Sequence, residues 1–222
     1  MKPRTPLDKE LELIGESEGY KIIYLDNYDY LAKGVCVNNI NHIFAKPIDV
    51  SDDIDNVLDD GEPQFKVAFL SEEMCELLKS ILHSNLSIKI NRTGNYMYLK
   101  TNLISLQLIF KVDYMVDYMI MCVEKCTQVE EDLIEIYNGT LTSVSLLSKK
   151  YEAKIPTLNK DITTRVTVEI ALHLNIDNKA VVLGMPTPNI DGDEPIEIYD
   201  ESDDILDFVN LHQIKKSREI NE

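Results

Sequence analysis

The stretch from Gln64 to Val112 constrains the fold most, because its apolar pattern changes period in a definite order. Apolar residues first alternate at Phe65, Val67 and Phe69, as they do in a strand with one buried face. Ser71 then stands at a helix N-cap position, and the two glutamates after it favour the positive end of a helix. Three- and four-residue apolar spacing follows and predicts an amphipathic helix of about three turns. Its apolar positions are Met74, Leu77, Leu78, Ile81 and Leu82.

Three strand-like runs complete this stretch, namely Leu86–Asn91, Tyr96–Lys100 and Ile104–Val112. The turn formers at 92–95 reverse the chain between the first run and the second. The order is therefore one strand, one helix and three antiparallel strands. One helix covering a meander of strands is an α+β module.

The residues before this module predict one helix and several short strands. Leu7–Ile14 has apolar residues at helical spacing after Pro6, which favours a packing helix. The next segments are rich in Tyr, Ile and Val between Asn, Asp and Gly turns, and read as strands. They are Tyr20–Leu25, Tyr28–Lys33, Val35–Val37 and His42–Lys46, and an acidic surface connection follows at Pro47–Glu62.

The second half predicts a long helix, a hairpin and an acidic end. Val129–Tyr151 has helical apolar spacing, and Thr157–Thr164 is expected to form a short second helix. Val166–Ile176 alternates and turns at Asp177-Asn178 into Ala180–Met185, which predicts a β-hairpin. Pro195–Tyr199 and Leu206–Ile214 are expected last strands, the second with a helix as its alternative, and Lys215–Arg218 is expected to fray. The overall expectation is α+β with two modules, 1–119 and 120–222.

A tandem repeat joins these modules, Val112-Asp113-Tyr114-Met115 followed by Val116-Asp117-Tyr118-Met119. A four-residue repeat stacks like residues along a helix face, whereas a strand scatters them over both faces. Flexible Met and Tyr side chains suit adaptable partner binding, so Tyr114, Met115, Tyr118 and Met119 are candidate partner-binding residues. The alternative is a buried connection between two half-domains.

The formal net charge of −17 argues against a protein that grips nucleic acid over its whole surface. The charge is uneven, because Ser51–Glu62 and Asp191–Asp207 lack Lys and Arg while a basic stretch lies between Lys149 and Arg165. No apolar run is long enough to span a bilayer, so we expect a cytoplasmic protein with no membrane partner, in the host cytoplasm if the chain is viral.

The sequence contains no recognisable catalytic motif. It has no glycine-rich phosphate loop and no nucleophile elbow, and its histidines at 42, 83, 173 and 212 stand singly. Cys36 and Cys75 lie in apolar runs as expected of small buried residues, and Cys122 with Cys126 lacks the further ligands of a zinc site. We therefore expect a non-enzyme with no catalytic residues, metal or cofactor.

Two local resemblances cover the same segment. Ile134–Ile162, with Ile136-Tyr137-Asn138-Gly139, Lys149-Lys150-Tyr151 and Ile155-Pro156-Thr157, resembles a helical segment in the substrate domain of ketopantoate reductases. The same residues also resemble a helix-turn-helix, with Leu147–Tyr151 and Thr157–Ile162 as its helices.

A wider resemblance covers the first half of the chain. Leu7–Ile14, Asn41–Lys46 leading into Pro47-Ile48-Asp49, and the strand, helix and meander from Phe65 to Val112 resemble the N-terminal domain of bacteriophage DNA sliding clamps. The resemblance implies a homotrimeric ring of two-domain subunits that encircles duplex DNA, with helices lining the hole and loose lysine contacts to phosphates. It implies DNA polymerase and a clamp loader as partners. Candidate DNA-facing residues are Lys79, Lys149, Lys150, Lys154 and Lys160.

Three functions follow as expectations. The first is a non-enzymatic, sliding-clamp-like processivity factor that tethers replication or transcription proteins to DNA. The second is an acidic viral regulatory protein that binds and modulates a host or viral protein without encircling DNA. The third is an enzyme fragment related to ketopantoate reductase.

Overall fold

In the computed structural model the chain divides into two compact units. One unit comprises Met1–Ser71 and Lys150–Val168, and the other comprises Glu72–Lys149 and Glu169–Glu222. The backbone is described at 11–17, 20–25, 30–37, 40–47, 65–92, 94, 96–113, 118–127, 132–156, 161–185, 196–214 and 216–220. Side chains are described at 68–92, 94, 96–111, 119–127, 132–150, 167–185, 196–214 and 218–220. These units have different bounds from the expected modules 1–119 and 120–222.

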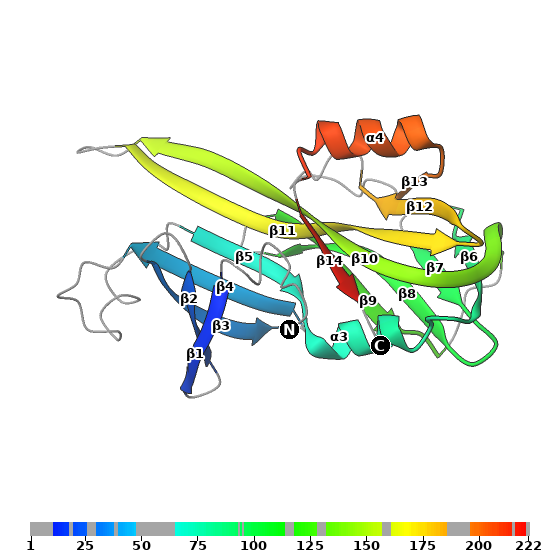
Figure 1. Ribbon diagram of the computed structural model, residues 1–222, viewed down its shortest axis with the longest axis horizontal. Helices are drawn as coiled ribbons and strands as arrows, with labels where there is room; N and C mark the ends of the chain where they lie inside the picture. Colours follow the sequence, from blue (N-terminus) through cyan, green and yellow to red (C-terminus); the bar gives the residue numbers. More distant parts are fainter. Residues whose placement is uncertain are drawn as a thin grey trace. The chain divides into compact units, whose positions relative to one another are not determined.

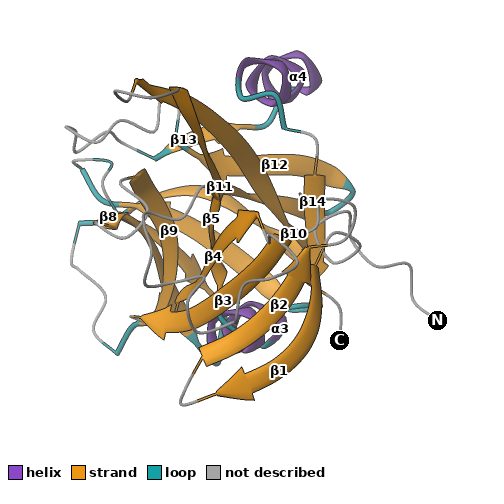
Figure 2. Cartoon of the chain, turned by 90° about the vertical axis from the view of Figure 1, so that its left-hand side faces the viewer, coloured by secondary structure: helices purple, strands orange, loops and turns teal. Residues whose placement is uncertain are grey.

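The first unit contains an antiparallel meander, seen as consecutive curved ribbons in Figure 2. Each strand pairs with the next along the chain. The strands are β1 (Leu11–Ser17), β2 (Tyr20–Leu25), β3 (Tyr30–Val37), β4 (Ile40–Pro47) and β5 (Phe65–Leu70). Residues Arg165–Val168 add a parallel pairing along β5.

The meander confirms most of the early strands and corrects two details. Residues 11–14 belong to strand β1, so the expected helix over Leu7–Ile14 is wrong there, and 7–10 lie outside the described residues. Pairing with β2 overrides the weak helical spacing, because tertiary context routinely outweighs propensity. The two runs expected on either side of Gly34 are one strand, β3, whose pairing with β4 continues through that glycine.

The second unit begins with the helix and meander expected from the apolar pattern. Helix α3 (Glu72–Lys79) is followed by β6 (Asn85–Ile90), β7 (Met97–Lys100), β8 (Ser105–Asp113) and β9 (Tyr118–Lys125). The strands pair antiparallel in chain order. The α-helix spans eight residues instead of about three turns, although Ile81 beyond its end is fully buried. This order of elements is confirmed.

Two long strands, β10 (Ile134–Pro156) and β11 (Asp161–Ile176), pass from one unit into the other. The helix expected over Val129–Tyr151 is therefore wrong from Ile134 onward, and the short helix over Thr157–Thr164 is wrong at 161–164. The helical segment of the ketopantoate reductase and helix-turn-helix resemblances is thus a strand over 134–156. Residues 128–131 and 157–160 lie outside the described part of the chain.

The expected hairpin of β11 and β12 (Lys179–Gly184) is confirmed, with its turn at Asp177-Asn178. Asp177 and Asn178 have φ values of 50° and 66°. Positive φ at both central residues is the requirement of a two-residue type I′ turn, and Asp and Asn tolerate it. The chain then reaches β13 (Glu197–Tyr199), which confirms the strand expected there.

The C-terminal elements correct two predictions. Residues Ser202–Leu211 form helix α4, so the strand expected over Leu206–Ile214 is wrong and its helical alternative is right. Strand β14 (Lys216–Ile220) pairs antiparallel with Val144–Ser148 of β10, so the expected frayed tail is wrong. The tail is held because Ile220 is buried and Arg218 reaches a buried carboxylate.

The second unit has an extensive apolar core from its strands and one face of each helix. Its fully buried members include Leu78, Leu86, Leu99 and Leu108 with Leu146, Leu172 and Leu183. The described residues are thus mostly antiparallel sheet with two helices, which is compatible with the α+β class. Within the part of the chain that the structure describes, no helix is both long and apolar enough to cross a bilayer.

Candidate functional site

The expected DNA-facing lysines do not share one kind of element. Lys79 lies on α3 and forms an ion pair of 2.5 Å with Glu76 one turn earlier. Lys149, Lys150 and Lys154 lie on strand β10, so the helix expected over Val129–Tyr151 is wrong at Lys149 and Lys150. Consecutive residues of a strand point to opposite faces, so Lys149 and Lys150 do not line one surface together. Lys160 lies outside the described residues.

Lys149 is partly buried instead of facing solvent. Its Nζ lies 3.3 Å from Nδ1 of His212, which is 1% exposed at the C-cap of α4. Burial lowers the pKa of Lys149 below the ordinary value of lysine, because desolvation disfavours the charged form. A lysine in this setting holds two elements of the fold together and is poorly placed to contact phosphates.

The tandem repeat contributes to two paired strands. Asp113 at the end of β8 is opposite Tyr118 at the start of β9, so the repeat is not a continuous helix. Met119 is 5% exposed and belongs to the core, so it is not available as a partner-binding side chain. Tyr114 and Met115 lie outside the described residues, and of Tyr118 only the backbone is described.

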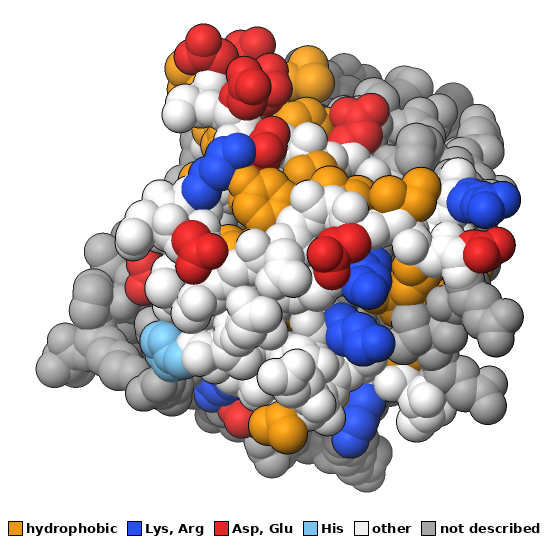
Figure 3. Space-filling view, turned by 90° about the vertical axis from the view of Figure 1, so that its right-hand side faces the viewer, with side chains coloured by type: hydrophobic (Ala, Val, Ile, Leu, Met, Phe, Trp, Pro, Cys, Tyr) orange, Lys and Arg blue, Asp and Glu red, His pale blue; other side chains and the backbone are white. Residues whose placement is uncertain are grey.

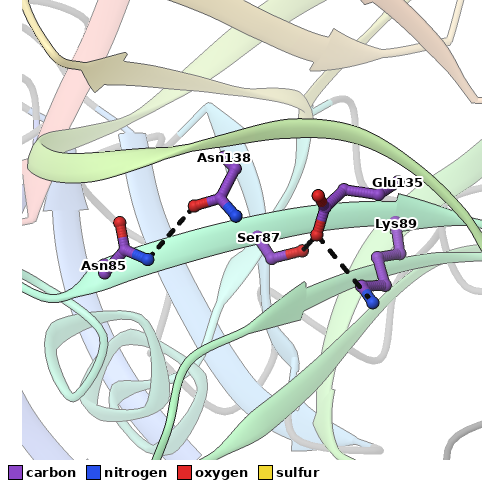
Figure 4. A network of polar contacts seen from close by, with 5 residues as sticks. All are labelled: Asn85, Ser87, Lys89, Glu135 and Asn138. Carbon is purple, nitrogen blue, oxygen red and sulfur yellow. Dashed lines mark hydrogen bonds and ion pairs between the residues drawn. The ribbon is translucent and has the colours of Figure 1, made fainter.

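A polar ladder covers neighbouring positions of β6 and β10 (Figure 4). Ser87 Oγ donates to Glu135 Oε2 at 2.5 Å, and Lys89 Nζ lies 3.9 Å from the same carboxylate oxygen. The hydrogen bond from Ser87, followed by the charge of Lys89, holds the pKa of Glu135 below its usual value. Asn85 Nδ2 donates to Asn138 Oδ1 at 3.1 Å. These side chains satisfy one another's hydrogen-bonding groups on an exposed face of the strands.

A buried ion pair ties the C-terminal strand into the second unit. Arg218 of β14 donates through Nε and Nη2 to the two carboxylate oxygens of Glu169, at 2.9 and 3.0 Å. Glu169 is 3% exposed, and this two-pronged geometry satisfies both of its oxygens. Burial raises the pKa of the nearby Cys75 thiol despite the guanidinium beside it, so this cysteine stays protonated at neutral pH. The Arg218–Glu169 pair has a structural role, because it holds β14 against the rest of the second unit. The only sequence feature that points to it is an arginine in the polar segment Lys215–Arg218.

The segment from β13 through helix α4 is strongly acidic. From Glu197 to Leu211 the sequence has six carboxylates and no Lys or Arg. Lys179 on β12 pairs with Asp200 at 2.7 Å and lies 5.4 Å from the centre of the Tyr137 ring. The remaining acids of α4 and its N-cap point into solvent, because Glu201, Asp203, Asp204 and Asp207 are all exposed.

The inner side of α4 packs through one aromatic residue. Phe208 is 2% exposed, with its ring centre 4.7 Å from that of Tyr199 and 4.5 Å from that of His212. Its partners lie on β13 and at the end of the helix itself, so α4 rests as an outer layer on β12 and β13. In Figure 3, carboxylates gather at the top of the face, the level at which Figure 1 places α4.

Large exposed apolar side chains lie beside these acids. Leu206 is 55% exposed and Leu211 is 68% exposed, both on α4. The other large exposed apolar residues of the described part are Tyr96, Leu103, Ile134 and Ile136. The sequence pattern favours a strand over Leu206–Ile214, with a helix as the alternative, and therefore does not identify this helix as a site. The available signal was the run of acids at 200–207, which has Ile205 and Leu206 inside it.

No cluster of His, Cys, Asp or Glu with metal-binding geometry occurs among the residues that the structure describes. No protein-family model matches the chain, and no curated protein and no solved structure shows significant similarity to it.

Proposed function

We propose that this chain is a non-enzymatic acidic binding protein that docks on a basic protein partner without encircling DNA. The observation that carries the proposal is the outward chemistry of both described helices. The exposed positions of α3 include Glu72, Glu73 and Glu76, and its one cation, Lys79, is paired with Glu76. Helix α4 has acids in its first turn and no basic residue in its last turn.

Such helices repel phosphates and attract cationic surfaces, because interactions between exposed charges act over roughly a Debye length of 8–10 Å. The partner class that fits is a host or viral protein with a basic surface. A chain that covers the nucleic-acid-binding surface of such a protein would modulate it by charge mimicry. This role needs no cofactor and places the protein in the cytoplasm, the host cytoplasm if the chain is viral.

The proposal is tested by comparing two probes on the full chain. We expect a short amphipathic helical peptide of leucine and lysine to bind, with an affinity that falls as salt is raised. We expect linear duplex DNA to show no binding under the same conditions. Tight binding to duplex DNA and none to the cationic peptide would reverse the assignment.

A sliding-clamp-like processivity factor is the second candidate, supported by the strand, helix and meander order of β5, α3, β6, β7 and β8. This candidate keeps duplex DNA, a DNA polymerase and a clamp loader as partners and a homotrimer as its assembly. Its decisive measurement is the mass in solution by size-exclusion chromatography with light scattering, since ring closure requires a defined subunit number. A trimer retained on circular DNA and lost from linear DNA would favour it over the first proposal.

A further inference from the structure

The outward face of α4 has an ordered layout. At about 100° per residue, Asp203, Asp207 and Asn210 form a strip centred roughly 130° around the helix from the buried Phe208. Leu206 lies on one side of this strip and Leu211 on the other. The face therefore alternates across the helix as apolar, acidic and apolar.

This layout is not required by the fold. The apolar contact that seats α4 comes from its inner side, where Phe208 is 2% exposed against 55% for Leu206 and 68% for Leu211. An exposed leucine is ordinary by itself, but two on one short helix, beside exposed acids, form a small mixed surface. Aspartates beside leucines can contact an amphipathic segment with both kinds of group at once.

Charge decides between the occupants that could cover this face. A second copy would bring the same carboxylates and a net charge of −17, so the two helices would repel each other. An anionic lipid surface is repelled in the same way. A cationic segment is attracted, and its apolar residues can cover the leucines.

We propose that the outward face of α4 is a docking surface for a cationic amphipathic segment of another protein. Lysine or arginine side chains of that segment lie over Asp203 and Asp207, and its apolar side chains cover Leu206 and Leu211. The inference rests on the proposed function and adds the surface through which it acts. In the proposed complex a helical segment of the partner packs along α4. Burial of the leucines supplies most of the affinity, and the charges set the orientation of the partner helix.

The test uses the full chain and a fluorescent leucine–lysine peptide, read by anisotropy. The double variant Leu206→Ser/Leu211→Ser should bind about tenfold or more weakly, because each leucine loses apolar surface that binding buries. The variant Asp203→Lys/Asp207→Lys should lose at least as much affinity and most of the salt dependence. An all-lysine peptide of equal charge should bind the unaltered chain more weakly than the mixed peptide.

Two matched variants separate this surface from general attraction. Leu103 is 95% exposed between β7 and β8, so Leu103→Ser removes an exposed leucine elsewhere. Glu124→Lys/Glu219→Lys reverses two exposed acids on β9 and β14, away from both helices. Both should bind like the unaltered chain, and equal losses in these variants would mean unspecific attraction and overturn the inference.

The remaining outcomes distinguish a failure of the α4 surface from a failure of the proposed function. If the peptide binds and the α4 variants bind equally well, the α4 surface is wrong while the proposed function stands. If the unaltered chain fails to bind the peptide, both fail. A dimer that Leu206→Ser/Leu211→Ser abolishes would assign the face to a second copy, and binding to phosphatidylserine vesicles lost in that variant would assign it to a lipid surface.

Discussion

The two helices of the second unit carry similar charge and differ in how they join the fold. Helix α3 buries Met74, Cys75 and Leu78 and packs against β9 and β14. Helix α4 buries Phe208 alone and rests on β12 and β13. The first helix is thus part of the core, and the second is a layer added to it.

The difference appears again in what each helix exposes. The apolar residues of α3 are buried or half-buried, so its outward face is polar. Helix α4 exposes Leu206 and Leu211 next to its acids. Exposed apolar side chains add little to the stability of the fold, but a partner can bury them on binding. The proposed docking face therefore lies on α4 and not on α3.

The largest loss of unfolding free energy is expected for substitution of Arg218 on β14, the strand that packs against α3. Arg218→Met leaves the carboxylate of Glu169 buried without its two hydrogen bonds, which should cost about 3–5 kcal/mol of unfolding free energy. Urea unfolding measures the change. The double variant Glu169→Leu/Arg218→Met should recover much of the loss, since no buried charge remains. A cost near zero for Arg218→Met would mean that β14 is not anchored through this pair.

The next largest loss of stability is expected for one of two neighbouring leucines of α3. Leu78 is fully buried and Leu77 is only half-buried, so Leu78→Ala should cost about 2–5 kcal/mol and Leu77→Ala less than half as much. The two variants have the same change of side chain and the same helix propensity. Equal costs in urea unfolding would show that α3 is not integrated into the core in the way that distinguishes it from α4.

A smaller loss of stability is expected where Phe208 of α4 packs against Gly184 of β12. A Cβ at Gly184 would lie 2.8 Å from Cζ of Phe208 and 2.9 Å from Cβ of Ala171, closer than carbon atoms approach in proteins. Gly184→Ala should therefore cost about 1–3 kcal/mol through overpacking. Adding Phe208→Leu should return part of the stability, because leucine lacks the ring atoms Cζ and Cε2 that make the close contact. A neutral Gly184→Ala would mean that α4 shifts freely on the sheet, as a loosely added layer would.

The sequence predicted the elements whose pattern and turn chemistry agree. The stretch from Phe65 to Asp113 alternates, becomes helical and alternates again, and all of its elements form as expected. The hairpin at Asp177-Asn178 was predictable because the turn residues and the flanking alternation favour the same structure.

Strand β10 was mispredicted because its apolar residues do not keep one period. Buried residues fall at Gly139 and Leu141 and then at Val144 and Leu146, with exposed residues at 142 and 143 between the two sets. The three-residue step from Leu141 to Val144 resembles the apolar spacing of a helix. The Thr, Ser and Val content, which favours a strand, is a weaker signal. The pairing with β6 and β14 that settles the strand depends on residues distant in the sequence.

The smallest effect is expected on the outer face of α4, and it completes the contrast between the helices. Leu206→Ser and Leu211→Ser should each change the free energy of unfolding by no more than about 0.5 kcal/mol, because neither side chain is seated in the core. Leu78→Ser on α3 is the matched variant and should cost several times more, since it leaves a hydroxyl in a fully buried position. Thermal and urea unfolding of the three variants measure these changes. A cost at α4 as large as that at Leu78 would place Leu206 and Leu211 among the residues that hold the fold together, and the face would then be unavailable to a partner.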